Sequence, residues 1–104
     1  MKSLDIGVLD DFVDGEARQV RLDGLVLVVV RIEGDVYVLD DRCSHEDFSL
    51  AEGEVNVATR EIECARHGAM FRLRDGEPMS FPATRPVAHY QVHARDGRLE
   101  VSVP

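Results

Sequence analysis

Two short clusters of metal-ligating side chains stand out in this sequence. The first is Cys43-Ser44-His45 and the second is Cys64-Ala65-Arg66-His67, with 18 residues between them. Together they use both cysteines and two of the four histidines of the chain. Ligands that occur in spaced pairs indicate a metal site much more strongly than a lone Cys or His does. We therefore expect metal binding by Cys43, His45, Cys64 and His67.

The way in which the two ligand types are divided between the clusters bears on the metal. Cys₂His₂ is a common structural zinc set, but zinc modules usually pair two Cys in one cluster with two His in the other. Here each cluster supplies one Cys and one His. This division suits a two-iron cluster in which one iron takes both thiolates and the other takes both imidazoles. The alternative is a structural zinc module that mediates protein contacts, which would be colourless and without a redox signal.

Short apolar stretches between turn dipeptides must position these ligands. Asp23-Gly24 and Asp96-Gly97 are typical of tight hairpin turns, and the segments between turns are rich in Val, Ile and Leu. The run 25–30 has no polar face, which predicts a central strand buried on both sides. The fold class is therefore all-β, a small antiparallel sandwich or barrel. We predict strands over residues 18–22, 25–32, 36–40, 55–59, 61–64, 87–95 and 98–103.

Length and charge exclude several classes of function. The 104 residues are enough for one domain, 1–104, and the net charge of −8 argues against nucleic acid or an anionic membrane as partner. The longest apolar run has six residues, too few to span a bilayer, and the N-terminus lacks the apolar stretch of a secretory signal. We therefore expect a cytoplasmic protein. Residues 1–54 carry −9 and residues 55–104 carry +1, which is either a solvated acidic face or a steering field for a basic partner.

With these ligands, the sequence resembles the Rieske-type [2Fe–2S] proteins, and among them the soluble Rieske ferredoxins. The resemblance extends from about residue 20 to 103 and includes Gly68 after His67, the region of Gly53, and the segment 81–86. It implies one [2Fe–2S] cluster, in which Cys43 and Cys64 bind one iron while His45 and His67 bind the other. It also implies a small antiparallel β fold with a cluster-binding subdomain at one tip, where the Pro82 loop covers the cluster.

The sequence departs from the high-potential members of that family at four positions. A disulfide between the two ligand loops would need cysteines where this chain has Phe48 and Arg66. Side-chain donors to the cluster sulfurs would need a Ser and a Tyr where it has Ala69 and Phe71. Because such donors stabilise the reduced cluster, their absence predicts a reduction potential at the low end of the Rieske range, roughly −150 mV or somewhat below.

A low potential favours one role among those that the resemblance implies. It is the role of a one-electron carrier, a monomer with transient partners, from an NAD(P)H-dependent flavoprotein reductase to a terminal non-haem iron oxygenase that attacks aromatic rings. Catalysis by this chain itself is not expected, because mononuclear iron would need two further His and a carboxylate, and only His89 and His93 are left. The alternative is a Rieske protein associated with iron–sulfur cluster assembly or with a nitrite reductase.

Some residues near the ligands are expected to have structural roles only. Met70 and Phe71 are interpreted as core residues. Asp40 and Asp41 are interpreted as solvated turn residues close to the first ligand cluster. In the segment 87–95, His89 and His93 alternate with apolar residues, which predicts that both imidazoles are exposed on one face of a strand.

Overall fold

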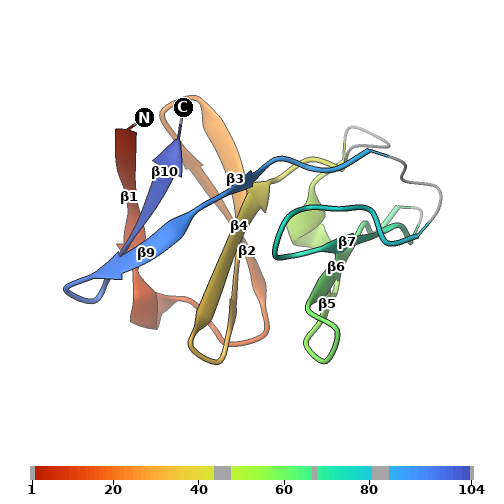
Figure 1. The fold of residues 1–104 in the computed structure, drawn as a ribbon, viewed down its shortest axis with the longest axis horizontal. Helices are drawn as coiled ribbons and strands as arrows, with labels where there is room; N and C mark the ends of the chain where they lie inside the picture. The colour runs from red at the N-terminus through yellow and green to blue at the C-terminus, as the bar shows by residue number, and fades with distance from the viewer. Residues whose placement is uncertain (1, 44–47, 67, 81–84, 104) are drawn as a thin grey trace.

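The computed structural model describes residues 2–43, 48–66, 68–80 and 85–103. Within these ranges the chain forms three antiparallel sheets and two single-turn 3-10 helices (Figure 1). The predicted all-β class is therefore confirmed. No described helix has the length and apolar character needed to cross a bilayer. The elements in chain order are β1 (Lys2–Val8), η1 (Leu9–Asp11), β2 (Ala17–Leu22), β3 (Leu25–Ile32), β4 (Asp35–Asp40), η2 (Leu50–Glu52), β5 (Val55–Asn56), β6 (Glu61–Glu63), β7 (Met70–Arg72), β8 (His89–Tyr90), β9 (Val92–Arg95) and β10 (Arg98–Val103).

Two of the three sheets make up one part of the molecule, which we call the base. Their strand orders are β2-β3-β4-β8 and β1-β10-β9. Two of the hairpins in the base turn at Asp23-Gly24 and at Asp96-Gly97, where all four residues have φ between 51° and 79°. Positive φ at both central residues is the turn whose twist matches that of the flanking strands, and Asp-Gly tolerates it well. The dipeptides thus close the hairpins that the sequence predicts.

Strand β3 lies between two hydrophobic cores. Leu27 and Val29 face the core shared with β1 and β10, whereas Val28, Val30 and Ile32 face the core shared with η2, β6 and β7. The side chains of residues 27–30 are 0% exposed. The prediction of a strand buried on both faces is confirmed. Complete burial of each such side chain stabilises the fold by roughly 1.5–3 kcal/mol.

The segment predicted as one strand over 87–95 divides between the two sheets of the base. Tyr90 of β8 pairs with Val38 of β4, whereas Val92 of β9 pairs with Val101 of β10. Gln91 lies at the break, where its carbonyl accepts a hydrogen bond from the amide of Ser102 at 2.9 Å. The chain crosses from one sheet to the other here, so the period-2 pattern continues although the strand partner changes. The predicted exposure of both histidines is confirmed, but Ala88 and Ala94 are exposed as well.

Two strands were not predicted from the sequence. Strand β1 pairs with β10 along its whole length, with a register shift between Asp5 and Gly7, and buries Ile6 in the core of the base. Its alternation of Leu4, Ile6 and Val8 is the signal that could have identified it. Strand β7 has only three residues, which is too short for a pattern to be recognised. In addition, the strand predicted over 55–59 ends at Asn56.

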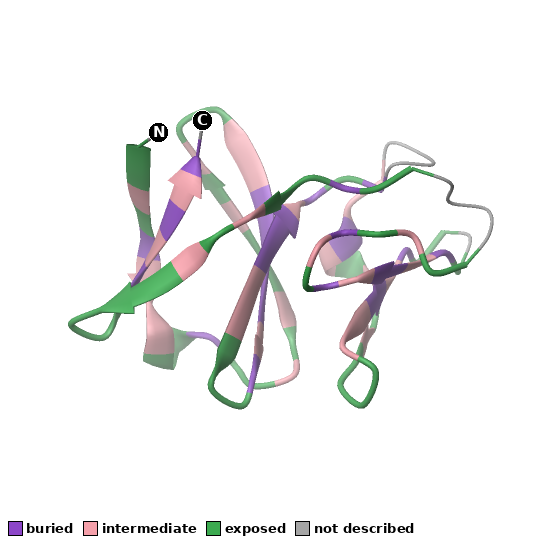
Figure 2. Ribbon diagram, viewed as in Figure 1, coloured by how far each residue is buried: buried purple, intermediate pink, exposed green. Residues whose placement is uncertain are grey.

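The third sheet, β5-β6-β7, belongs with η2 to a smaller part of the molecule, which we call the tip. It lies on the right of Figure 1, beside the end of β4. Its interior is continuous with one face of β3, because Leu50, Ile62 and Phe71 pack in the same buried cluster as Val28 and Val30 (Figure 2). The tip therefore shares a core with the base instead of having one of its own.

Two close backbone approaches hold the segments of the tip together. A Cβ atom added to Gly53 would lie 1.6 Å from the carbonyl oxygen of Glu63, and one added to Gly76 would lie 1.9 Å from that of Val87. No side chain fits at such distances, so each position requires glycine. In the turn between β5 and β6, the guanidinium of Arg60 donates hydrogen bonds to the Asp35 carboxylate at 2.5 Å and to the Tyr37 hydroxyl at 2.7 Å. Arg60 thereby links the tip to β4 of the base.

Candidate metal centre

The two cysteines lie at corresponding places in two loops. Cys43 follows the end of β4, and Cys64 directly follows the end of β6. Their side chains are 2% and 0% exposed, and both belong to the core cluster that includes Ile62 and Phe71. Two strands from different sheets thus bring the predicted thiol ligands into one buried region. The two predicted imidazole ligands, His45 and His67, lie outside the described residues.

Each ligand loop is closed by a backbone hydrogen bond from its cysteine. The amide of Cys43 donates to the carbonyl of Phe48 at 2.9 Å, and the amide of Cys64 donates to the carbonyl of Ala69 at 2.7 Å. In both loops the acceptor lies five residues after the cysteine, and the predicted histidine lies between them in the sequence. The second loop has one more constraint, because the amide of Gly68, at φ 74°, donates to the Cys64 carbonyl at 2.9 Å. The same backbone hydrogen bond, from the cysteine amide to the carbonyl five residues later, therefore closes both loops.

The donor set fits an iron–sulfur cluster bound between the loops. Thiolate sulfur is the usual protein ligand of such clusters, and two thiols are present where the loops leave the core. Their surroundings are apolar, since Leu50, Ala69 and Phe71 are each 0% exposed. An apolar shell limits the access of water to a metal centre. The described residues therefore include two of the four predicted ligands, with buried apolar side chains behind them.

The positions at which the sequence departs from high-potential relatives are described by the structure. Ala69 and Phe71 are fully buried and have no side-chain hydrogen-bond donor, and Phe48 is half-buried. Phe71 pairs with Ile62 across the sheet, so its interpretation as a core residue is confirmed. Neither Ala69 nor Phe71 can donate a side-chain hydrogen bond to a sulfur atom near the cysteines.

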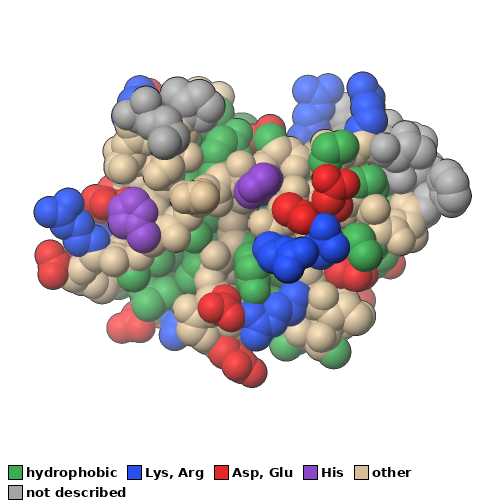
Figure 3. All heavy atoms as spheres, viewed as in Figure 1, with side chains coloured by type: hydrophobic (Ala, Val, Ile, Leu, Met, Phe, Trp, Pro, Cys, Tyr) green, Lys and Arg blue, Asp and Glu red, His purple; other side chains and the backbone are tan. Residues whose placement is uncertain are grey.

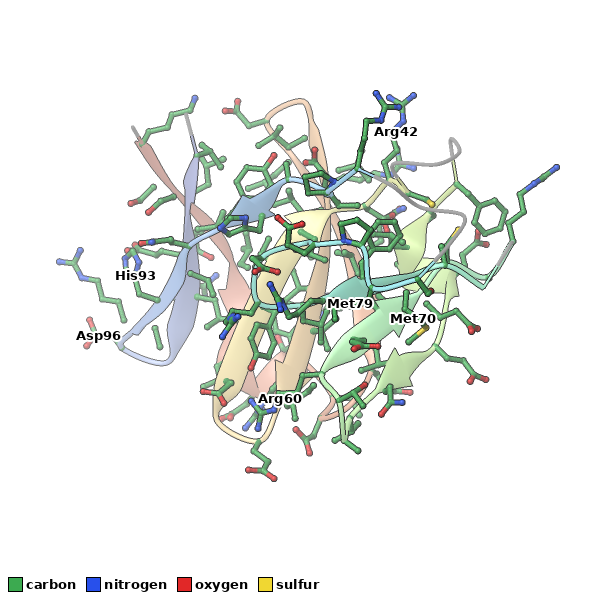
Figure 4. All side chains as sticks on the ribbon, turned by 45° about the vertical axis from the view of Figure 1, so that its right-hand side comes forward. Arg42, Arg60, Met70, Met79, His93 and Asp96 are labelled. Atoms are coloured by element: carbon green, nitrogen blue, oxygen red, sulfur yellow. The ribbon has the colours of Figure 1, made fainter. Side chains whose placement is uncertain are left out.

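A third segment, 78–80, lies against β7 beside the two loops. The amide of Met79 donates to the carbonyl of Met70 at 2.7 Å, and the hydroxyl of Ser80 accepts from the amide of Met70 at 3.0 Å. Figure 4 shows Met70 and Met79 close together at this edge of the tip. Sequence reasoning missed Ser80, whose ability to bond a backbone amide is the only signal it offers. The predicted Pro82 loop begins next to this segment, and Pro82 itself lies outside the described residues.

The expectation that Asp40 and Asp41 are solvated turn residues is wrong. Asp40 is half-buried, and its carboxylate accepts a hydrogen bond of 2.6 Å from the hydroxyl of Tyr90. Burial of the phenol, followed by this bond to an anion, raises the pKa of Tyr90 to about 12. Asp41 is only 6% exposed, the one polar or charged residue that is buried in the described part of the chain. The residue after β4 is therefore buried, whereas two consecutive acidic residues in a sequence indicate exposure.

The charge near the ligand loops differs from that of the whole chain. Arg42, which precedes the first cysteine-containing cluster, and Arg66, which lies within the second, are exposed, and so is Arg85. Figure 4 shows Arg42 projecting from the edge of the molecule, and Figure 3 shows arginine or lysine side chains gathered at that edge. The loop segments 42–48, 65–68 and 81–85 sum to +1 in the sequence, although the chain carries −8. The acidic surplus thus belongs to the rest of the molecule.

The remaining histidines are separate from this region. His89 and His93 lie on β8 and β9, which belong to different sheets of the base. The imidazole of His93 lies 3.1 Å from the carboxylate of Glu100 on β10. The spacing of four residues between His89 and His93 would place both on one face of a helix, but these residues lie on strands β8 and β9. This agrees with their interpretation as exposed strand residues.

Comparison with known proteins gives consistent matches over nearly the whole chain. The family model described as "Rieske [2Fe-2S] domain" matches residues 3–91. The "3-phenylpropionate/cinnamic acid dioxygenase ferredoxin subunit" of Photorhabdus laumondii subsp. laumondii is 33% identical over 103 residues, covering 99% of this chain and 96% of that protein.

Solved structures show the same similarity. The "Ferredoxin of carbazole 1,9a-dioxygenase from Nocardioides aromaticivorans IC177" superposes with a TM-score of 0.94 at 29% identity, covering 98% of each chain. A ferredoxin-like match in the "Complex of reduced oxygenase and oxidized ferredoxin in carbazole 1,9a- dioxygenase" has a TM-score of 0.89 at 32% identity, covering 96% of this chain and 92% of the other. The architecture described above is therefore that of these ferredoxins, from end to end.

Proposed function

We propose, since this chain belongs to the Rieske [2Fe–2S] domain family, that it is the electron-carrying ferredoxin component of a multicomponent oxygenase system. The observation that carries the proposal is the pair of buried cysteines opening two similarly closed loops, in a chain that matches ferredoxin subunits along its full length. It carries electrons for a partner and is not the catalytic component. We further propose that residues 1–104 form a single Rieske domain.

The two loops support an assignment of the ligands. We propose that Cys43 and Cys64 bind one iron and that His45 and His67 bind the other, so that each loop contacts both irons. When bound, the [2Fe–2S] cluster supplies reversible one-electron chemistry. The part played by the chain is to bury the thiolates against Phe71 and Ala69, which excludes water from the sulfur side of the site.

The reduction potential should lie at the low end of the Rieske range, roughly −150 mV or somewhat below. The formal charges of two ferric ions, two sulfides and two thiolates sum to zero, so any Rieske cluster is reduced at a higher potential than a cluster with four thiolates. The position within the Rieske range then depends on the surroundings of the cluster. The buried Ala69 and Phe71 offer no donors that would stabilise the reduced state further. A low potential suits a carrier that receives electrons from a reduced flavin.

The partners are inferred from the relatives. The printed names of the matching proteins include dioxygenase ferredoxin subunits and a complex of ferredoxin with oxygenase. We propose a terminal non-haem iron oxygenase as electron acceptor and an NAD(P)H-dependent flavoprotein reductase as donor, both in the cytoplasm. A monomer with small, transient interfaces below about 1,200 Å² suits a carrier that must exchange partners.

Electrostatics should act mainly on the approach to these partners. The loop segments are close to neutral, whereas the remainder of the molecule carries the acidic surplus. Attraction of that surplus to a basic partner would raise the rate of encounter at low salt. We expect electron transfer to slow as salt is raised from about 20 to about 500 mM, over which the Debye length falls several-fold. A rate that does not change would remove steering from the proposal.

The decisive experiment is an EPR-monitored redox titration of anaerobically purified protein. We expect an anisotropic Rieske-type signal that grows as the potential falls below about −100 mV. Cys43→Ser and Cys64→Ser should each abolish it, whereas His93→Gln should leave it intact. A signal that grows well above zero would keep the cluster and overturn the low-potential carrier. A colourless protein with one zinc and no signal would overturn the proposed function.

A further inference from the structure

The carboxylate of Asp41 has no role in the site described so far, although it is buried two residues before Cys43. It is 6% exposed, whereas acidic residues are almost never fully buried without partners. Its backbone amide donates to the carbonyl of Val26 on β3 at 2.9 Å. The backbone of Asp41 is therefore fixed at the junction between the base and the first ligand loop.

Three donors converge on this carboxylate. The side-chain amide of Gln19 on β2 donates at 2.5 Å, the hydroxyl of Ser49 at 2.5 Å, and the backbone amide of Ala51 in η2 at 2.7 Å. Both carboxylate oxygens accept at least one of these bonds.

The same contacts tie down both ends of the first loop. Asp41 precedes Cys43, and Ser49 follows Phe48, whose carbonyl accepts the loop-closing bond from the Cys43 amide. The bond between Asp41 and Ser49 thus lies directly outside the one between residues 43 and 48. Together the two bonds form a frame around the segment that contains the predicted ligand His45.

The charge of Asp41 is also close to the proposed iron site. Two residues of extended chain span at most roughly 7 Å, so the Cα atoms of Asp41 and Cys43 are no farther apart than that. None of these three donors carries a positive charge. In a buried setting, a negative charge at this range disfavours the addition of an electron to its neighbour.

We propose that Asp41 is a positioning residue that holds the first ligand loop on β2 and η2 and whose buried negative charge lowers the reduction potential of the cluster. The inference rests on the proposed function through the assignment of Cys43 as a ligand. It adds a second source of low potential to the missing donors at Ala69 and Phe71. The two sources are separable, because one concerns hydrogen bonds to sulfur and the other concerns a fixed charge.

The test compares Asp41→Asn with Asp40→Asn in the cluster-loaded protein. Both substitutions remove one negative charge, and the two positions are adjacent, but the carboxylate of Asp40 bonds to Tyr90 on β8. We expect Asp41→Asn to raise the potential in the EPR titration by more than Asp40→Asn does. We also expect it to release iron to a chelator several-fold faster than either Asp40→Asn or the unmodified protein. A potential equal to or below that of the unmodified protein, or a shift no larger than that of Asp40→Asn, would overturn the proposal.

A second variant covers the case in which Asp41→Asn does not hold a cluster. Ser49→Ala removes one donor and keeps the charge, so it should speed iron release and hydrogen exchange at the amides of Cys43 and Ala51 while moving the potential less than Asp41→Asn. If exchange and release are unchanged in Ser49→Ala, the positioning role is wrong. If the unmodified protein itself shows no Rieske signal, the proposed function fails, which is a different result from an unmoved potential.

Discussion

The base and the tip are held together in different ways. The base has strands of up to eight residues joined by short hairpins, and its cores are filled by Val, Leu and Ile. The strands of the tip have two or three residues each, and its segments are held by single hydrogen bonds and by backbone approaches that only glycine allows. Both parts bury apolar side chains, since Leu50, Ile62 and Phe71 of the tip are 0% exposed, but the tip depends in addition on specific backbone contacts around its ligand loops.

The largest expected effect comes from a methyl group at the closest backbone approach in the tip. Gly53→Ala would place a Cβ 1.6 Å from the Glu63 carbonyl, one residue before Cys64, so the backbone must move. We expect a loss of at least about 3 kcal/mol in unfolding free energy, the upper end of overpacking costs, together with loss of cluster binding.

Gly34→Ala in the base is the matched control for that substitution. Gly34 lies in a hairpin turn, and a Cβ atom added there would have no other atom within 4 Å, so we expect a change within about 0.5 kcal/mol and normal iron content. Denaturant unfolding and iron analysis measure both quantities. Equal effects of the two substitutions would contradict the contrast between tip and base.

Removal of the cluster should loosen the tip and leave the base unchanged. The amides of Cys64 and Leu73 in the tip donate backbone hydrogen bonds next to strands of only three residues, whereas the amides of β3 lie between two paired strands. After chelation of iron, we expect hydrogen exchange to be at least about tenfold faster at Cys64 and Leu73 but similar at Val28 and Val29. Uniform acceleration across both parts would show that the cluster stabilises the molecule as a whole.

The Tyr90–Asp40 bond, which lies where the base meets the first loop, should weaken in strong alkali. The raised pKa of Tyr90 means that the folded state favours the neutral phenol. The associated stability is present below pH 10 and is lost as the pH rises through about 12. In Tyr37→Phe, where Tyr90 is the only tyrosine, ultraviolet titration of the phenolate should give a midpoint near 12. The midpoint should move toward 10 in the same protein carrying Asp40→Asn; a midpoint of 10 without that change would contradict the bond.

The smallest expected effect concerns the ion pair at the end of β7. Arg72 donates two hydrogen bonds to Asp75, at 2.9 and 2.5 Å, and this lowers the pKa of the Asp75 carboxyl to about 2. Its contribution to stability is therefore present above pH 4 and is lost as the pH falls through about 2. We expect thermal unfolding of the apo-protein to show a slightly steeper loss of stability over this range than Asp75→Asn does. Parallel curves would mean that the pair contributes nothing measurable.

The sequence allowed more to be predicted about the base than about the tip. Strand β3 was predicted with its observed bounds, because its apolar run and flanking turns are local signals. The break at Gln91 could not be predicted, since a strand that changes partners keeps its alternating pattern. In the tip, the ligand spacing pointed to Cys43 and Cys64, but the burial of Asp41 depends on donors from β2 and η2 that are distant in sequence.

The burial of β3 on both faces has a consequence for folding. Side-chain patterning normally fixes the register of a strand, because a shift by one residue would turn its apolar side chains to solvent. Over residues 27–30 such a shift would exchange one set of apolar side chains for another, so the pattern does not penalise it strongly. The register must instead come from the turns at either end, Asp23-Gly24 and Glu33-Gly34, where Asp23 and Glu33 both have positive φ. Lengthening either turn by one residue would therefore produce misaligned sheets with well-filled cores, a kinetic trap and not an unfolded chain.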